Sequence, residues 1–356
     1  MKRAGMLACA VMLIMLLLLP ACSNIAAQGD LTAPPEQPRG QIYLYGEQHS
    51  VEKILDKELE LWNDYYHNKS MRHLFIEMPY YTGEYLNLWM KSDSDEILDA
   101  IYDDWSGTAA HSPDTKEFYK KIKSQCPETI FHGTDVGHQY YNTGDRFLAY
   151  LIKNNLKDSE QYRLTKEAIE QGKYYYKHND TVYRENKMSE NFIREFDKLS
   201  NENTMGIYGA AHTGLDAMDI TNTVPCMAKQ LKKQYGDAVH SEDIRKLIDP
   251  VRTDTIKVDE KDYKALYYGK QDMKSFSRDY TSREFWRLEN AYDDFRDRSK
   301  TGDVLPYDNY PMLVEKGQVF VIDYTKTDGT VVRKYYRSDG YVWKGKPWTE
   351  EFVLDD

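Results

Sequence analysis

Ionisable side chains follow four short apolar runs of this sequence, each directly after its run. They are Glu47 and His49, Glu77, Asp135 and His138, and His212. Carboxylates and histidines that lie close together repel or desolvate one another unless a bound charge or shared protons offset that cost. Such a set is therefore typical of a site that moves protons or holds a metal.

The first two of these residues, Glu47 and His49, lie two positions apart behind a glycine. On an extended chain both side chains face the same way, and a glycine lets other backbone approach closely. A histidine–carboxylate pair can activate water by general base catalysis. Alternatively, the histidines and carboxylates of this set could together hold a divalent metal.

The apolar runs themselves predict strands. They are Ile42–Tyr45, His73–Ile76, Thr129–His132 and Met205–Tyr208, each followed by a turn or helix signal. Stretches with helical spacing of apolar residues separate them, as crossover connections require. We therefore expect an α/β fold with a mostly parallel sheet flanked by helices. Ligands of such sheets bind beyond the carboxyl ends of the strands, where the ionisable residues should converge.

The end of the chain has a different pattern. Thr281-Ser282-Arg283-Glu284 has the form of a capping box and predicts a helix, with one apolar face from Phe285 to Phe295, that ends at Gly302. Asp328-Gly329 then separates two strand-like segments, which is typical of a hairpin. We expect a small antiparallel β meander over residues 301–356.

The beginning of the chain predicts a lipid anchor. Residues 1–21 combine two basic residues with an apolar run shorter than the ~20 residues of a membrane span. They end in Leu19-Pro20-Ala21-Cys22, which is similar to the lipobox of bacterial lipoproteins. Cys22 would be lipidated and hold the protein on a bacterial membrane, outside the cytoplasm. The proline-rich residues 22–40 predict a flexible tether, and residues 41–300 the α/β domain.

The charge of the chain limits the class of binding partner that is expected, and its cysteine content limits the possible disulfides. With 47 basic and 58 acidic residues the formal charge is −11, so no nucleic-acid surface is expected. Cys126 and Cys226 remain once the signal and the lipidated cysteine are set aside. An even pair outside the cytoplasm favours one disulfide, and two separate buried thiols are the alternative.

Two G-x-x-H elements, Gly46-Glu47-Gln48-His49 and Gly209-Ala210-Ala211-His212, lie on either side of Glu77. Together they resemble the erythromycin esterase, ChaN and TraB/TIKI superfamily. The segment Arg184–Phe192 strengthens the resemblance, because this superfamily often has an R-x-x-x-M-x-x-N helix before the last G-x-x-H strand. The resemblance covers about half of the chain, from Gln41 to Asp219.

The resemblance implies an α/β fold with its site at the strand ends and the site positions Glu47, His49, Glu77, His212 and Arg184. Superfamily members differ in activity, and they include macrolide esterases, metal-dependent membrane-tethered proteases and a haem-binding lipoprotein. In the esterase scheme His49 would be the base, a glutamate would orient it, and His212 would stabilise charge on the substrate oxygen. In the protease scheme His49, Glu77 and His212 would ligate a divalent metal that lowers the pKa of bound water. The first motif lacks the T-H-G form of macrolide esterases, which disfavours a macrolide substrate.

We therefore expect a membrane-anchored hydrolase that acts on an ester or peptide bond of a small-molecule or peptide substrate, with or without a divalent metal. The alternative is a non-enzymatic lipoprotein that binds haem or another small ligand. The high tyrosine content, 30 residues, mildly favours binding.

Overall fold

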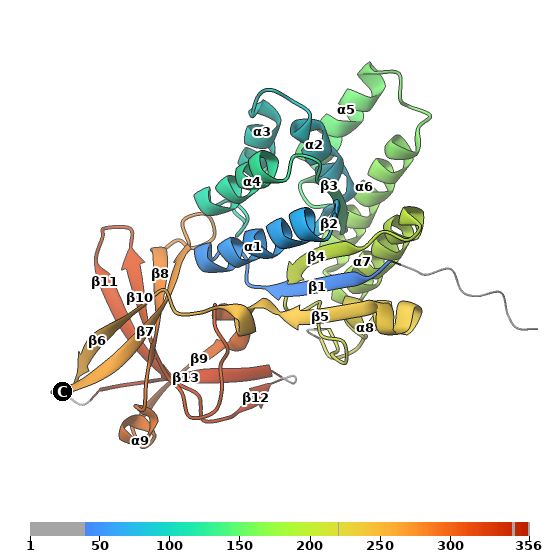
Figure 1. Ribbon diagram of the computed structural model, residues 1–356. Coiled ribbons are helices and arrows are strands. Elements are labelled where there is room, and N and C mark those ends of the chain that lie inside the picture. The colour runs from blue at the N-terminus through green and yellow to red at the C-terminus, as the bar shows by residue number, and fades with distance from the viewer. Residues whose placement is uncertain (1–39, 220, 344–345, 355–356) are drawn as a thin grey trace, which may run out of the picture. The chain divides into compact units, whose positions relative to one another are not determined.

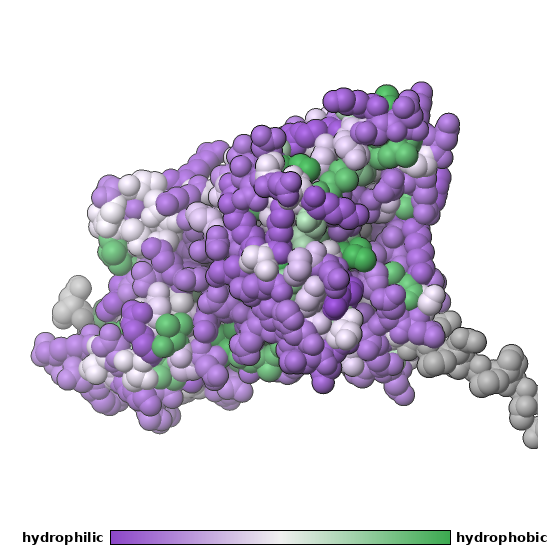
Figure 2. Space-filling model, turned by 45° about the horizontal axis from the view of Figure 1, so that its top comes forward, coloured by the Kyte–Doolittle hydropathy of each residue, from purple (hydrophilic) through white to green (hydrophobic). Residues whose placement is uncertain are grey.

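The computed structural model describes residues 40–219, 221–343 and 346–354 of the chain (Figure 1). The expected signal sequence, the tether and Cys22 lie outside these residues. Within them, no helix has both the length and the apolar character needed to cross a membrane. The face in Figure 2 is mainly hydrophilic, with apolar side chains in small scattered patches.

The first half of the described chain forms the expected α/β fold. Its parallel sheet has the order β3-β2-β4-β1-β5. The strands are β1 (Ile42–Glu47), β2 (His73–Pro79), β3 (Ile130–Asp135), β4 (Thr204–Gly209) and β5 (Val239–Asp243). The four apolar runs of the sequence are β1 to β4, so the prediction of a parallel sheet is confirmed.

Helices cover both faces of this sheet (Figure 1). They are α1 (Glu52–Asn68), α2 (Tyr80–Met90), α3 (Glu96–Asp104), α4 (Pro113–Gln125), α5 (Asp145–Lys153), α6 (Glu160–His178), α7 (Thr181–Phe196) and α8 (Met227–Tyr235). Side chains alternate along each strand. On β1, Ile42 and Leu44 pack with α7 and α8, whereas Tyr45 packs on the other face with α1 to α6.

The second half forms an antiparallel sheet of eight strands, in the order β12-β13-β11-β10-β8-β7-β6 with β9 paired to β13. The strands are β6 (Arg252–Val258), β7 (Lys261–Asp272), β8 (Tyr280–Leu288), β9 (Lys300–Pro306), β10 (Val319–Lys326), β11 (Val331–Arg337), β12 (Val342–Trp343) and β13 (Lys346–Phe352). Both sheets belong to one compact unit, Pro38–Asp356, and Val51 before α1 forms an isolated bridge with Gln271 of β7.

The helix predicted over residues 281–302 is wrong for most of its length: its first part belongs to β8, its end belongs to β9, and only Tyr292–Phe295 between them forms a short helix, α9. Phe285 and Trp286, adjacent in sequence, are buried in two different cores on opposite faces of the sheet. With both faces buried, the strand shows no alternation of apolar and polar residues. The antiparallel sheet also begins at Arg252, well before residue 301, because β6 is mostly exposed and polar and so lacks the apolar run that marks a strand. The hairpin at Asp328-Gly329 is confirmed by the pairing of β10 with β11.

The disulfide predicted as one of two alternatives does not form. Cys126 and Cys226 are both free and buried. They lie in hydrophobic clusters on opposite faces of the parallel sheet, so the sheet itself separates them. Their thiols donate instead to Asn63 Oδ1 at 3.3 Å and to the Gly214 carbonyl at 2.9 Å. Burial raises the pKa of Cys126 to about 11.

Candidate functional site at the strand ends

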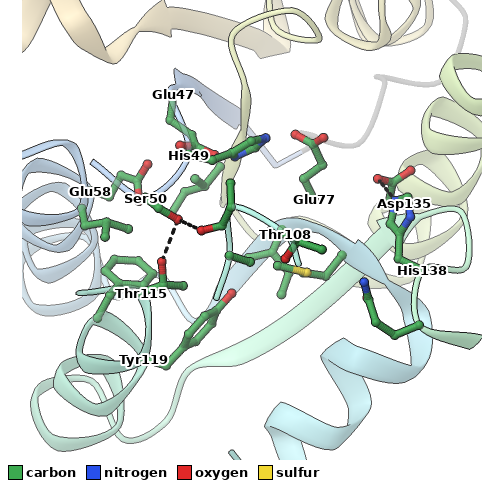
Figure 3. Close-up of a pocket in the computed structure, with 18 of the residues that line it drawn as sticks. Glu47, His49, Ser50, Glu58, Glu77, Thr108, Thr115, Tyr119, Asp135 and His138 are labelled. Carbon is green, nitrogen blue, oxygen red and sulfur yellow. Dashed lines mark hydrogen bonds and ion pairs between the residues drawn. The ribbon is translucent and has the colours of Figure 1, made fainter. Parts of the chain in front are cut away.

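The carboxyl ends of four neighbouring strands bring the predicted residues together. Parallel pairing places Glu47 of β1 opposite Gly209 of β4, and Pro79 of β2 opposite Asp135 of β3. Two cavities of about 280 and 380 Å³ lie at this edge. The residues common to both cavities are Glu47, His49, Glu77, Ala109 and Arg184. Asp135 and His138 line the first cavity, shown in Figure 3, and His212 lines the second.

Arg184, on the first turn of α7, joins two strand ends. Its Nη2 donates to Glu77 Oε1 at 2.6 Å and to Asp135 Oδ2 at 2.5 Å, and its Nε donates to Asp135 Oδ1 at 3.1 Å. Burial alone would raise the pKa of Glu77, but His212 and Arg184 outweigh it and lower this pKa to about 2. Arg184 likewise overcomes burial and holds the pKa of Asp135 well below its usual range. Both carboxyls are therefore ionised at neutral pH.

His49 forms the second charged pair. Its Nδ1 makes a short hydrogen bond with Glu47 Oε1. The Glu47 carboxylate raises the pKa of His49 to about 10, so the imidazole carries its proton at neutral pH. The side chain remains 49% exposed, and no described residue hydrogen-bonds its Nε2. The backbone carbonyl of His49 accepts from Gln271 Nε2 at 2.9 Å, which ties this loop to β7.

His212 follows β4 and faces Glu77 from the other side. Its Nδ1 hydrogen-bonds Glu185 Oε2 at 2.6 Å, and its Nε2 lies 3.5 Å from Glu77 Oε1. Burial lowers the pKa of His212, but Glu77 and Glu185 outweigh this effect and raise it. Glu185 also accepts from the backbone N–H of Met227 at 2.5 Å, at the start of α8. Glu185 therefore fixes the ring orientation of His212.

His138 is held beside this cluster. Its Nε2 lies 2.9 Å from Asp135 Oδ2, and its Nδ1 lies 2.5 Å from the hydroxyl of Tyr176 on α6. Both ring nitrogens have partners, so His138 supports Asp135 and has no free nitrogen for a substrate.

The glycines of the two G-x-x-H elements permit this close approach. A Cβ atom on Gly209 would lie 3.3 Å from Glu77 Oε2 and 3.4 Å from the His49 ring, and one on Gly46 would lie 2.3 Å from Thr213 Oγ1. The Gly209 N–H donates to Glu77 Oε2 at 2.6 Å. Each glycine therefore provides the space in which the two strand ends meet.

The donor set does not fit a resident divalent metal. Among the residues that the structure describes, no group of three or more histidine, cysteine or acidic side chains is arranged to hold a metal ion. The guanidinium of Arg184 already pairs with both Glu77 and Asp135, and Glu77 Oε2 accepts from the Gly209 N–H. Arg184, which is always protonated, thus occupies the position beside Glu77 that a metal ion would need.

Sequence reasoning missed several residues of the site. Glu58 of α1 and Tyr119 of α4 line the first cavity, and Glu185 and Gln271 position His212 and His49. Only Glu58 left a signal in the sequence. It lies on the apolar stripe of its own helix, one turn from Ile54 and one turn from Trp62, where a charged residue is unusual.

No family model and no curated protein matches this chain. Solved structures with a similar fold include a Bacillus cereus protein, with 12% identity and a TM-score of 0.40 over 57% of this chain and 65% of its own. A succinoglycan biosynthesis protein has 14% identity and a TM-score of 0.41 over 57% of this chain and 65% of its own. A mutant of the erythromycin esterase EreC in its open conformation has 10% identity and a TM-score of 0.40 over 57% and 69%. The chain thus spans about 65% of the first two structures, and the likeness concerns the fold alone.

Proposed function

We propose that this protein is a hydrolase that cleaves an ester bond of a small-molecule substrate at the strand-end site. One observation carries the proposal: His49, bound through Nδ1 to Glu47, has an unpartnered Nε2 beside a cavity of about 280 Å³. A histidine oriented by a carboxylate with its second nitrogen free is the arrangement used for proton transfer to a bound substrate.

In this proposal His49 acts as the proton donor, because Glu47 raises its pKa to about 10. The resemblance implied a base at this position. Water adds its oxygen to the ester carbonyl carbon and gives a proton to Glu47, while His49 Nε2 gives a proton to the departing alkoxide. Glu47 then releases its proton to water and His49 Nε2 takes one up from water, so both side chains regain their starting state. Arg184 and His212 supply positive potential that favours the negative charge on the carbonyl oxygen.

The test is hydrolysis of p-nitrophenyl hexanoate by the purified protein. His49→Ala and Glu47→Gln should each lower kcat/KM by about a hundredfold or more, as is common for loss of a proton-transfer group. His178→Ala, which removes an exposed histidine at the end of α6, is the matched control. The wild-type rate should fall above a pH of about 10, where His49 loses its proton.

Two outcomes would replace the proposed ester substrate by another ligand. Cleavage of labelled casein, with the ester left intact, would make a peptide the substrate. A Soret shift on addition of hemin to a protein that cleaves neither compound would instead favour the alternative of a haem-binding lipoprotein.

We further propose that the protein acts at a bacterial membrane surface through a lipid on Cys22. The support is the sequence Leu19-Pro20-Ala21-Cys22 behind a basic and apolar segment. Cys22→Ala should abolish the incorporation of labelled palmitate and release the protein from the membrane fraction. Unchanged labelling and retention in that variant would contradict the anchor.

A further inference from the structure

The inner end of the first cavity contains a carboxyl group without a partner. Glu58 lines this cavity with only 1% of its surface exposed. No described residue hydrogen-bonds either of its oxygens, and Oε1 is fully buried. A buried polar group without a partner is rare in folded proteins, because it loses its hydrogen bonds to water and gains none in return.

A second polar group lies beside it. Tyr119 of α4 lines the same cavity and is 4% exposed, and no described residue hydrogen-bonds its hydroxyl. Figure 3 shows Glu58 and Tyr119 reaching the cavity from two different helices, with the Tyr119 hydroxyl pointing into it. We call these two residues the cavity floor. The wall next to the floor is apolar, formed by Leu55, Ile76, Phe118 and Ile207.

The protein provides no cation for this floor. Arg184 directs its nitrogens to Glu77 and Asp135, and His49 is paired with Glu47. Among the described residues, no lysine or arginine forms an ion pair with Glu58, and Arg184 is the one cationic side chain of that kind that lines the cavity. Among the described residues Glu58 therefore has no partner, and a ligand that enters the cavity can supply one.

We propose that the cavity floor binds the protonated amine of an aliphatic ligand, whose hydrocarbon chain lies along the apolar wall. An ammonium group has three N–H donors and no acceptor, so it can satisfy Glu58 and the Tyr119 oxygen together. A ligand hydroxyl has one donor and leaves an acceptor unsatisfied. The inference rests on the proposed function in one respect: because the cavity opens at His49, the amine would belong to the ester substrate.

Direct binding of two matched probes tests the floor without any need for catalysis. Hexylamine should bind the wild-type protein at pH 7 about tenfold more tightly than 1-hexanol, measured by isothermal titration calorimetry. Glu58→Gln keeps the size of the side chain but has no proton to lose when an ammonium binds beside it, and should bring the two affinities within about twofold of each other. Tyr119→Phe should reduce the preference by a smaller factor.

Glu60→Gln is the matched control, because it makes the same chemical change on an exposed position of the same helix. It should keep the tenfold preference. Equal binding of the two probes by wild-type protein, binding of neither, or a preference for hexylamine that survives in Glu58→Gln would each overturn the proposal.

The two proposals fail separately. If hexylamine binds through Glu58 while p-nitrophenyl hexanoate is not cleaved, the amine site stands and the hydrolase is wrong. If the ester is cleaved in a His49-dependent way while hexanol binds as tightly as hexylamine, the hydrolase stands and the amine site is wrong.

Discussion

Two glutamates of one cavity, Glu77 and Glu58, are each at most 10% exposed, yet the structure shifts their pKa values in opposite directions. Glu77 accepts from Arg184 and from the Gly209 N–H, both at 2.6 Å, and its pKa falls to about 2. Glu58 accepts from no described residue, and burial together with Glu47 raises its pKa well above the usual value. Hydrogen-bond partners, and not depth alone, decide the charge of a buried carboxyl.

The difference follows from the elements that carry them. Glu77 lies near the end of β2, where the backbone N–H of Gly209 at the end of β4 is free to donate. Glu58 lies in the middle of α1, where every backbone N–H already donates within the helix. A strand end thus stabilises an ionised carboxyl with its own backbone, whereas the middle of a helix depends on a side chain or a ligand.

The largest effect is expected when Arg184, the cation that pairs with Glu77, is removed. Arg184→Met leaves Glu77 and Asp135 as buried carboxylates without their counter-ion. The free energy of unfolding at pH 7 should fall by about 3–5 kcal/mol, measured by urea denaturation. The loss should be smaller at pH 4, where carboxyls freed from Arg184 can take up protons. A loss of under about 1 kcal/mol at pH 7 would show that the charge of Arg184 does not hold this region together.

Removal of the Glu77 carboxyl should lower the free energy of unfolding by a smaller amount, and this loss should depend on pH. The pKa of Glu77 falls from 4.5 to about 2, so its ionisation contributes on the order of 3 kcal/mol to stability. A lowered pKa stabilises above the unfolded value, and this contribution disappears as the pH falls from about 5 to 2. Glu77→Gln should therefore be clearly destabilised at pH 7 and approach the wild type only near pH 2 in urea titrations. Glu170→Gln, at an exposed ion pair, should change little at either pH.

The sequence predicted the position of Glu77 in the site better than that of Glu58, for a physical reason. Strand ends of a parallel sheet meet at one edge whatever the helices between them do, so Glu47, Glu77, Asp135 and His212 could be placed together from β-strand patterns alone. The place of Arg184 in the site followed only from the resemblance, and its pairing with Glu77 and Asp135 was not predicted, because α7 reaches the edge through packing that no local pattern encodes.

Other parts of the site depend on contacts between distant segments. Tyr119 reaches the cavity because α4 packs on α1, and Gln271 reaches His49 across 222 positions of the chain. The strand β8 was mistaken for a helix because both of its faces are buried, which removes the alternation that marks a strand. The cysteine pair was equally unpredictable, since only the fold shows that a sheet lies between the two thiols.

The smallest change in the free energy of unfolding is expected at Glu58, and it tests directly whether Glu58 differs from Glu77. A raised pKa means that Glu58 supports the fold only below its unfolded pKa near 4.5, and that wild-type stability is lost as the pH rises above it. Glu58→Gln escapes this loss and should be about 1 kcal/mol more stable than the wild type at pH 8, with the gain gone near pH 3.5. Urea titrations at the two pH values measure it. A variant that is less stable than the wild type at pH 8 would place Glu58 in the same class as Glu77, with a protein partner of its own, and would leave no unmet hydrogen-bonding capacity for an amine to satisfy.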